Sequence, residues 1–235
     1  KAIVAFQSYT RDAVGLRPED SFWNLADPGW AYGIYFGITG PLSMGHPITL
    51  YDGPFTVEST CRVIKKYGIT NLTGSPTAYR MLIAAGAAFS SKIKGQLRVV
   101  SSAGEPLNPE VIRWFADELN VTIHDHYGQT EVGMVLCNHH GLDHPVHMGA
   151  AGFASPGHRI VVLDDNHQEL PVGQPGILAV DRSQSPMCWF GGYQGFNTKA
   201  FVGNYYLSGD TVELNPDGSI SFVGRSDDVI TTSGY

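Results

Sequence analysis

Basic residues are scarce in this sequence. Its 15 lysines and arginines are outnumbered by 22 aspartates and glutamates, which gives a formal net charge of −7. A surface that follows the phosphates of a nucleic acid needs an excess of positive charge. We therefore expect no nucleic-acid partner, although backbone amides could still bind a small anionic ligand.

Cysteine and long apolar runs are scarce too. The three cysteines, Cys61, Cys137 and Cys188, include no CxxC pair, so neither a disulfide framework nor a thiolate zinc site is indicated. No stretch approaches the roughly 18 consecutive apolar residues of a membrane span. The first residues also lack the zones of a secretory signal. These absences predict a cytoplasmic protein without a membrane span.

The residues that are present indicate a globular protein. Of the 235 residues, 43% are hydrophobic and 16% are charged, which is enough to bury one substantial core or two small ones. The chain starts within a pattern at Lys1 and stops at Gly234 and Tyr235 without a terminating signal. We therefore expect it to be a fragment of a longer protein.

Between residues 48 and 127, β-rich runs alternate with helical patterns, which is typical of βαβ units and a parallel sheet. Thr56 is placed to cap a helix that Gly68 ends, and Pro76 suits the first turn of another. Asn108 and Pro109 begin a further helix. The expected strands are 48–51, 70–73, 97–101 and 121–124, and an earlier helix is expected over 2–13.

Glycine or small polar residues follow three of these strands, at 74–75, 103–104 and 127–128. In open α/β sheets, ligands bind outside the carboxyl ends of the strands. We therefore expect these three loops to converge on one site.

Beyond about Gly149 the pattern changes to strands punctuated by glycine and proline, which predicts an antiparallel layer or small barrel. The predicted fold is α/β: a parallel sheet with flanking helices, followed by a small antiparallel β subdomain. We predict an α/β subdomain over 1–148, a β-rich subdomain over 149–223, and a hinge segment over 224–235.

The densest cluster of reactive side chains is HDHYGQTEVG, residues 124–133. Tyr127 offers an aromatic face, Thr130 a hydroxyl and Glu131 a carboxylate, which suit stacking on a base, bonding a phosphate and holding a hard cation. By itself the segment is better explained as an ordinary strand-to-loop turn with a packed tyrosine.

Four further motifs favour the functional interpretation: SSAGEPL (101–107), GFASPG (152–157), YYLSGD (205–210) and GRSDDVITTSGY (224–235). Together with HDHYGQTE they resemble, in order and approximate spacing, the adenylate-forming superfamily of acyl-CoA synthetases, firefly luciferase and peptide-synthetase adenylation domains. ADPGW (26–30), PTAYR (76–80) and the final SGY are most similar to its acetyl- and medium-chain acyl-CoA synthetase branch.

This resemblance implies an enzyme that adenylates a carboxylic acid with ATP and Mg²⁺ and passes the acyl group to coenzyme A. Tyr127 would stack on adenine, Thr130 would contact the α-phosphate, Glu131 would hold the metal, Asp210 would bind the ribose, and Arg225 would reach the ribose or phosphate. The remaining nucleotide contacts would come from Gly104, Glu105, Pro106, Asp125, His126, Gly128 and Gln129. By the same resemblance Asp227 would be the hinge, and Ser233 and Gly234 would lie near the coenzyme A channel.

The chemistry of these side chains agrees with those roles. The two oxygens of Asp210 suit a vicinal diol, and Arg225 presents planar donors. Negative charge develops on the α-phosphate oxygens as pyrophosphate leaves. Thr130, Glu131 with its cation, and Arg225 would therefore be the catalytic residues.

The resemblance also bears on the size of the acid that the enzyme would use. Acetate-specific relatives tend to have tryptophan where this chain has Gly128, and each buried methylene is worth about 0.8 kcal/mol. We expect a medium-chain or branched acid, with Trp30, Ala31, Tyr32, Ala103 and Gly128 as pocket walls. Gly128→Trp is then expected to restore a preference for acetate. The family's phosphate loop and its terminal domain with the adenylation lysine are expected outside this sequence.

Some patterns in the sequence are also compatible with other functions. Six histidines invite a zinc site, but they lack the HExxH helical spacing; they are His124, His126, His139, His140, His144 and His147. The aromatic run 188–201 suits either a partner surface or the core of the β subdomain. The same chemistry could instead load a carrier protein, or the chain could be a non-catalytic nucleotide-binding relative. The oligomeric state is not encoded in any pattern found.

Overall fold

The computed structural model describes residues 1–196 and 198–226. Its helices are α1 (Ala2–Ser8), the π-helices η1 (Tyr9–Ala13) and η2 (Tyr32–Thr39), α2 (Gly40–Ser43), α3 (Val57–Tyr67), α4 (Pro76–Ala84), α5 (Ala87–Ile93) and α6 (Pro109–Leu119). Its strands are β1 (Phe22–Asn24), β2 (Ile48–Thr49), β3 (Asn71–Gly74), β4 (Val99–Ala103), β5 (Ile123–Gln129), β6 (Gly133–Cys137), β7 (Ala150–Ala154), β8 (Ile160–Leu163), β9 (Pro175–Asp181), β10 (Phe201–Val202), β11 (Tyr205–Leu214) and β12 (Ile220–Arg225).

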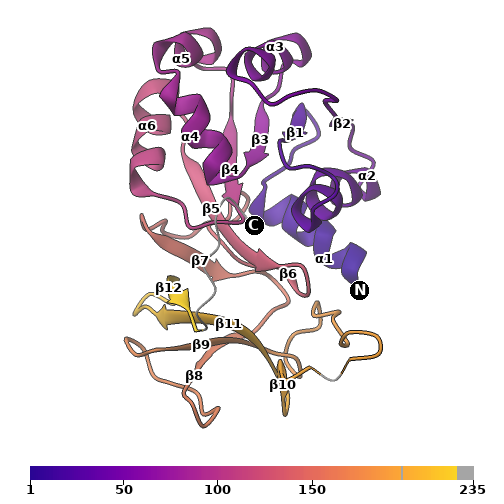
Figure 1. Cartoon of the computed structure of the whole chain (residues 1–235), viewed down its shortest axis with the longest axis vertical. Coiled ribbons are helices and arrows are strands. Elements are labelled where there is room, and N and C mark those ends of the chain that lie inside the picture. Colours follow the sequence, from indigo (N-terminus) through magenta and orange to yellow (C-terminus); the bar gives the residue numbers. More distant parts are fainter. Residues whose placement is uncertain (197, 227–235) are drawn as a thin grey trace.

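The strands of the described chain form one twelve-stranded sheet in the order β2-β1-β3-β4-β5-β6-β7-β12-β11-β9-β8, with β10 beside β11. The strands β1 to β5 pair in parallel, as the alternating pattern predicts. Helices α3 to α6 gather around these strands in the upper half of Figure 1, and the strands from β8 onward lie in the lower half. The expected α/β architecture is confirmed.

Local signals explain the helix boundaries well. The Thr56 side chain accepts a hydrogen bond from the Ser59 amide, the Ser59 side chain accepts one from the Thr56 amide, and Gly68 ends α3 at a φ of 61°. The Asn108 side chain likewise accepts from the Glu110 amide at the start of α6. Each cap satisfies backbone groups that a helix end leaves without partners.

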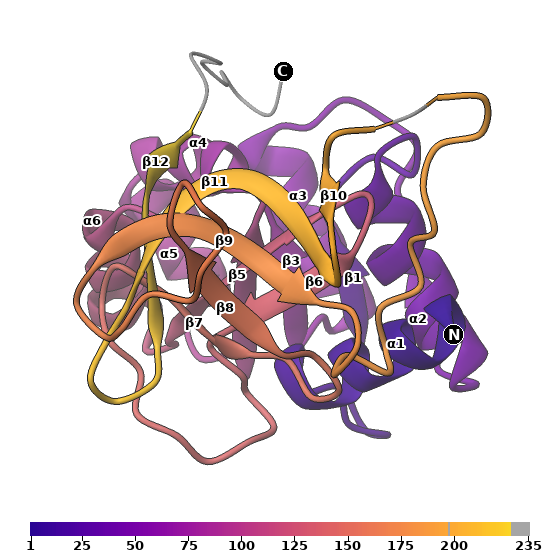
Figure 2. The same ribbon diagram turned by 90° about the horizontal axis from the view of Figure 1, so that it is seen from below.

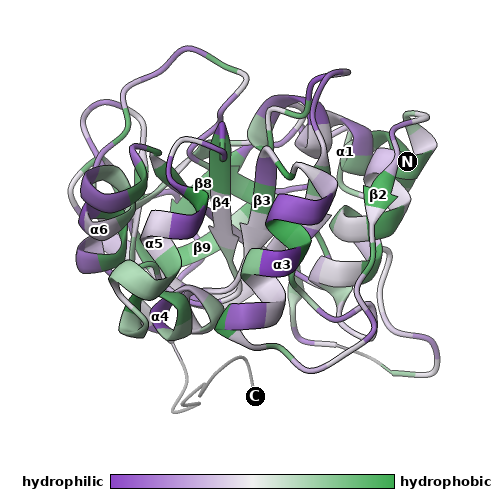
Figure 3. Ribbon diagram, turned by 90° about the horizontal axis from the view of Figure 1, so that it is seen from above, coloured by the Kyte–Doolittle hydropathy of each residue, from purple (hydrophilic) through white to green (hydrophobic). Residues whose placement is uncertain are grey.

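The main core lies between the parallel strands and their helices. Ile64 of α3, Leu72 of β3, Val100 of β4, Phe115 of α6 and Ile123 of β5 are essentially inaccessible to solvent. Seen from above, α3, α4, α5 and α6 surround the strands, and α3 carries strongly hydrophilic residues beside apolar ones (Figure 3). Burial of the apolar faces of these helices fixes the strand ends that carry the candidate site.

The antiparallel part begins earlier than the predicted subdomain boundary at residues 148 and 149. Strand β6 already runs antiparallel to β5, and β7 connects β6 to β12. Seen from below, β8, β9 and β11 cross the front of the molecule (Figure 2). They enclose a second core that includes Leu136, Val162, Val180 and Val212. The division into three parts stays a prediction.

Two features of the N-terminal part differ from the expected pattern. The helix expected over 2–13 is present, but from Tyr9 it widens into the π-helix η1. The short strand β1 was not predicted; it lies between β2 and β3, and all three of its residues are buried.

Within the described residues, no helix combines the length and the apolar character needed to cross a membrane.

Candidate functional site

A cavity of about 260 Å³ opens where the parallel strands meet the antiparallel part. Ten of its twelve lining residues are predicted nucleotide contacts: Gly104, Glu105, Pro106, Asp125, His126, Tyr127, Gly128, Gln129, Asp210 and Arg225. They come from the loop after β4, from β5, and from β11 and β12. The structure therefore brings together residues that lie more than 100 positions apart in the sequence.

Asp210, on β11, connects this strand to β5 and β12. It stands opposite Arg225 in the β11–β12 ladder, and the Arg225 Nη1 lies 3.1 Å from its Oδ1. The Tyr127 hydroxyl and the Gln129 side-chain amide, the latter at 3.0 Å, both donate to its Oδ2. The carboxylate itself is only 4% exposed. Charge-assisted hydrogen bonds of this kind stabilise an ionised carboxylate that water does not reach.

Tyr127 keeps its proton in this setting. Burial and the neighbouring Asp210 carboxylate raise the pKa of Tyr127 well above its ordinary value. The neutral phenol can therefore act as a hydrogen-bond donor, while its ring lines the cavity. A neutral aromatic face that is fixed at one end is suited to stacking on a planar base.

The loop after β4 is fixed from behind by a polar contact. The Glu105 carboxylate accepts hydrogen bonds from Thr77 at 2.7 Å and from Arg80 at 3.0 Å, both on α4. Gly104 has a φ of 98°, a conformation that side chains rarely allow. The loop therefore presents its backbone at Gly104 to Pro106 to the cavity in one fixed arrangement.

Asp125 lies on the β5 wall with one carboxyl oxygen sealed off. Its Oδ2 accepts a hydrogen bond from the Leu107 amide at 3.4 Å, and its Oδ1 has no hydrogen-bond partner among the described residues. Burial raises the pKa of Asp125 to about 8. The carboxyl is therefore mostly protonated at pH 7 and can donate as well as accept.

Thr130 and Glu131 lie in the turn between β5 and β6 and do not line the cavity. Glu131 accepts a hydrogen bond from the Tyr193 hydroxyl. No group of three or more potential ligands for a metal ion occurs within residues 1–196 and 198–226. Mg²⁺ commonly takes one or two carboxylates together with substrate phosphates, so a single carboxylate at Glu131 fits such an ion.

The structure shows no free space at Gly128 for the larger acid that was expected from the absence of a tryptophan there. A Cβ atom added there would lie 2.1 Å from the backbone oxygen of Gly133, because a bulge brings β6 against β5 at this point. The space expected from the missing indole is therefore filled by the backbone of β6. Gly128→Trp cannot place an indole there without moving that strand, so it is not a test of substrate size.

The other predicted walls of the acid pocket lie outside the nucleotide cavity. Trp30 is 42% exposed, whereas Ala103 is buried at the end of β4. Ala31 precedes η2, and Tyr32 begins it. Their role as pocket walls stays a prediction. The predicted hinge residue Asp227 and the predicted coenzyme A contacts Ser233 and Gly234 lie outside the described residues.

Sequence reasoning missed two cavity residues, Ala151 on β7 and Phe222 on β12. Both reach the cavity through the antiparallel sheet, so no local motif marks them. Phe222 lies 6.3 Å from the Tyr127 ring, measured between ring centroids. The alternating apolar pattern of β12 was the one signal that could have indicated an inward-facing residue there.

Of the six histidines considered as metal ligands, His126 and His139 are buried, whereas His147 is exposed and pairs with Asp217. The rings of His124 and His140 stack at 3.7 Å, and ring nitrogens of both lie near backbone carbonyls. Burial lowers the pKa of His124 to about 4 and that of His140 to about 3. The neutral rings of His124 and His140 act here as packing groups.

The aromatic run 188–201 is divided between core and surface. Phe190 and Phe201 stack at 5.5 Å and pack against the second core. Phe196 is 78% exposed and Tyr193 is 47% exposed. The core explanation is therefore confirmed for the two phenylalanines at 190 and 201 only.

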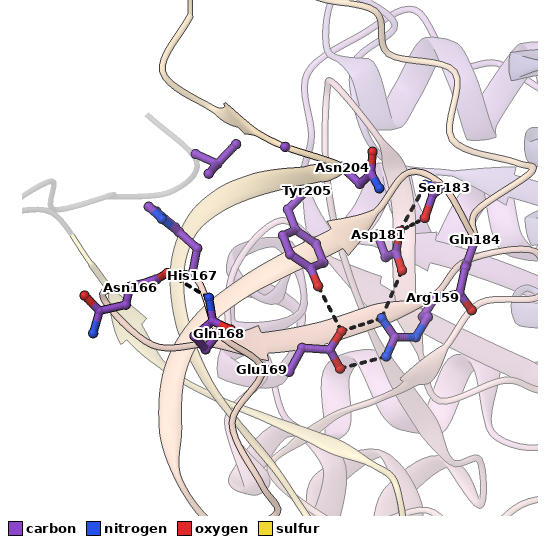
Figure 4. A pocket seen from close by; sticks show the side chains of 12 residues that line it. Arg159, Asn166, His167, Gln168, Glu169, Asp181, Ser183, Gln184, Asn204 and Tyr205 are labelled. Carbon is purple, nitrogen blue, oxygen red and sulfur yellow. Dashed lines mark hydrogen bonds and ion pairs between the residues drawn. The ribbon is translucent and has the colours of Figure 1, made fainter.

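A second cavity, of about 530 Å³, lies on the β8–β9–β11 layer and carries none of the predicted site residues. Arg159 forms two 2.7 Å hydrogen bonds with Glu169 and contacts Asp181 at 3.0 Å, and the Tyr205 hydroxyl also donates to Glu169 (Figure 4). Arg159, Glu169 and Asp181, which line this second cavity, therefore already form ion pairs with one another. We therefore take the smaller cavity as the candidate site.

The fold and the cavity define an α/β protein of the kind seen in the large domains of acyl-CoA synthetases and other adenylating enzymes. The chain belongs to the AMP-binding enzyme family, whose model matches residues 1–193.

Similar proteins are named as acetyl-CoA or acyl-CoA synthetases. Acetyl-coenzyme A synthetase of Bacillus subtilis (strain 168) is 37% identical over 223 residues, which are 93% of this chain and 39% of that protein. The mitochondrial acyl-coenzyme A synthetase ACSM3 of Rattus norvegicus is 35% identical over 92% of this chain and 37% of its own. The crystal structure of Brucella canis acyl-CoA synthetase is 60% identical with a TM-score of 0.94, covering all of this chain and 43% of that one. The chain thus spans about two fifths of these relatives.

Proposed function

We propose that this chain forms the nucleotide-binding part of an AMP-forming acid–CoA ligase. The observation that carries the proposal is the cavity in which Tyr127, Asp210 and Arg225 meet the loop of Gly104 to Pro106. It combines an aromatic face, an ionised carboxylate and a guanidinium. These groups suit a base, a ribose diol and a phosphate respectively.

In the proposed reaction the described residues bind and orient the nucleotide. The ring of Tyr127, whose hydroxyl is held by Asp210, stacks on adenine. The loop after β4 lines the same cavity. Asp210 accepts from the ribose hydroxyls, and Arg225 donates to ribose or phosphate oxygens. Thr130 and Glu131, at the turn beyond the cavity, act on the α-phosphate side, where Glu131 would hold Mg²⁺ that offsets charge on the phosphates.

Asp125 adds a preference for the base. Its buried carboxyl lies on the β5 wall beside Tyr127. Because Oδ1 is buried, only Oδ2 is left to meet the base, where it can accept from an amino group or, when it carries the proton, donate to a ring nitrogen. We propose that it recognises the edge of adenine.

We further propose that the acid is larger than acetate, with Trp30, Ala31, Tyr32 and Ala103 as walls of its pocket. The support is the small size of the two alanines and the position of η2 against β1 at the same sheet, and no longer the absent side chain at Gly128. A series of straight and branched acids tests this directly in the full-length protein. Acetate as the best substrate would refute it.

The experiment that tests the main proposal is acid-dependent exchange of radiolabelled pyrophosphate into ATP by the full-length protein. We expect exchange with at least one acid, and we expect it to be lost in Asp210→Ala. No exchange with any acid would support the non-catalytic alternative. Release of an acyl-CoA with free coenzyme A would separate a CoA ligase from an enzyme that loads a carrier protein.

A further inference from the structure

A continuous chain of hydrogen bonds runs behind the nucleotide cavity. The Tyr32 hydroxyl lies 3.2 Å from the Tyr9 hydroxyl, which lies 2.8 Å from Nδ1 of His126. Nε2 of His126 lies 3.2 Å from the backbone oxygen of Asn138. Tyr9 and His126 are at most 3% exposed. His126 lines the nucleotide cavity, whereas Tyr9 does not.

The chemistry of the groups fixes where each proton lies. A carbonyl oxygen can only accept, so Nε2 of His126 carries a proton and Nδ1 is an acceptor. The Tyr9 hydroxyl must then donate to Nδ1, and its oxygen accepts from Tyr32. Burial supports this assignment because it raises the pKa of both tyrosines and lowers that of His126. All three groups stay neutral and the chain has one direction.

The two tyrosines are supplied by the two π-helices of the described chain. Tyr9 is the first residue of η1, and Tyr32 is the first residue of η2. π-Helical turns are rare and often occur at functional sites. The helix of residues 2–13 thus widens at the residue that contacts the back of the cavity wall.

We propose that Tyr9 is a positioning residue of the nucleotide cavity, which holds the imidazole of His126 in one orientation and connects it to Tyr32 in η2. This inference rests on the proposed function, because it assigns a role to Tyr9 in binding the nucleotide. His126 has both ring nitrogens engaged, so it contributes a fixed wall beside Tyr127 and no proton transfer. Removing the Tyr9 hydroxyl would leave Nδ1 as a buried acceptor without a donor.

The test compares Tyr9→Phe with Tyr79→Phe in the full-length protein. Tyr79 is a matched control, because it is equally buried and donates one hydrogen bond, 2.7 Å long, to the Ser101 carbonyl away from the cavity lining. Both variants lose one buried hydroxyl. The readouts are the dissociation constant of AMP and the ¹⁵N chemical shift of His126 Nδ1.

We expect Tyr9→Phe to weaken AMP binding about 10-fold, because His126 loses the donor that fixes its ring beside Tyr127. The Nδ1 signal should move to that of an acceptor nitrogen without a hydrogen bond. Tyr79→Phe should keep the wild-type AMP affinity and the wild-type Nδ1 signal. Equal weakening in both variants, or wild-type affinity in Tyr9→Phe, would overturn the proposal.

The wild-type protein provides a check that needs no variant. A protonated Nδ1 in wild-type His126 would reverse the assigned direction and refute the positioning role, even if Tyr9→Phe does not fold. Failure of the wild-type protein to bind AMP would refute the proposed function instead. The two failures are therefore distinguishable.

Discussion

Asp210 has to share its oxygens if a ribose binds. An ionised carboxylate offers about four acceptor positions, and three are taken by Tyr127, Gln129 and Arg225. A vicinal diol brings two further donors. Ribose binding at Asp210 therefore replaces at least one of the present bonds, and the exchange is favourable only while the carboxylate keeps its charge.

Replacing Asp210 by asparagine tests this requirement. The variant keeps the size of the side chain but loses the charge, and hydrogen bonds to charged groups contribute about 1.5–3 kcal/mol. We expect AMP affinity to fall about 10- to 100-fold, measured by isothermal titration calorimetry. Asp181→Asn is the matched control, since Asp181 is equally buried and bonds to Arg159 at 3.0 Å outside the nucleotide cavity. Comparable losses in both variants would contradict a ribose site at Asp210.

Gly128 leads to a prediction about stability. Its added Cβ would meet backbone atoms of β6, which cannot move aside as a flexible side chain can. We expect Gly128→Ala to lower the free energy of unfolding by about 3 kcal/mol, the upper range for overpacking. Gly191→Ala, where nothing lies within 4 Å of an added Cβ, should be close to neutral. Chemical denaturation checks both, and an equally stable Gly128→Ala would show that β6 can shift.

At the scale of elements, local signals in the sequence predict the helix ends, whereas some details depend on long-range contacts. The caps at Thr56 and Asn108 and the turn at Gly68 determine helix ends within a few residues, so they could be predicted from the sequence. The strand β1 and the widening of the helix at Tyr9 depend on neighbours that are distant in sequence. No periodicity in the sequence carries that information.

The site shows the same division. The motif at 124–133 and the motif at 205–210 identify the cavity residues that share a short segment. The direction of a Cβ atom at Gly128 depends on the bulge between β5 and β6. The motif contains no information about that bulge. Phe222 joins the cavity through sheet pairing alone. Motifs thus predict the composition of the site, and tertiary packing decides its shape.

The histidine array on β5 and the segment after β6 predicts a loss of stability in mild acid. Buried His124 and His140 have folded-state pKa values of about 4 and about 3, below the ordinary value of 6.5. The unfolded chain therefore binds more protons below pH 6.5. The contribution of these neutral histidines to the free energy of unfolding is fully present above pH 6.5. It falls as the pH decreases from 6.5 toward 4, by at most about 1.4 kcal/mol per pH unit for each histidine.

His140→Gln isolates this effect. The glutamine amide can still donate toward the Val100 carbonyl that His140 contacts at 3.0 Å, but it does not titrate. We expect the variant to lose less unfolding free energy than the wild type between pH 7.5 and 5.5, measured by urea denaturation. Parallel losses in the two proteins would show that other groups control the acid response.

At the scale of the molecule, the nucleotide would bind across the connection between the parallel and antiparallel parts of the sheet. Binding to the native state alone raises its stability by about 2.7 kcal/mol at a ligand concentration of 100 times the dissociation constant. We expect AMP to raise the melting temperature of the wild-type protein. The same AMP concentration should have much less effect on Asp210→Asn. Equal shifts in both proteins would place the nucleotide elsewhere.

The Tyr127–Asp210 hydrogen bond joins residues 83 positions apart. Closing so long a loop costs entropy before any contact across it can compensate, and such non-local contacts tend to slow folding. The helices around β3 and β4, by contrast, can form from local contacts. During refolding, the ability to hold a nucleotide should therefore appear after most of the helical signal has returned, so ligand binding would report the last stage of assembly.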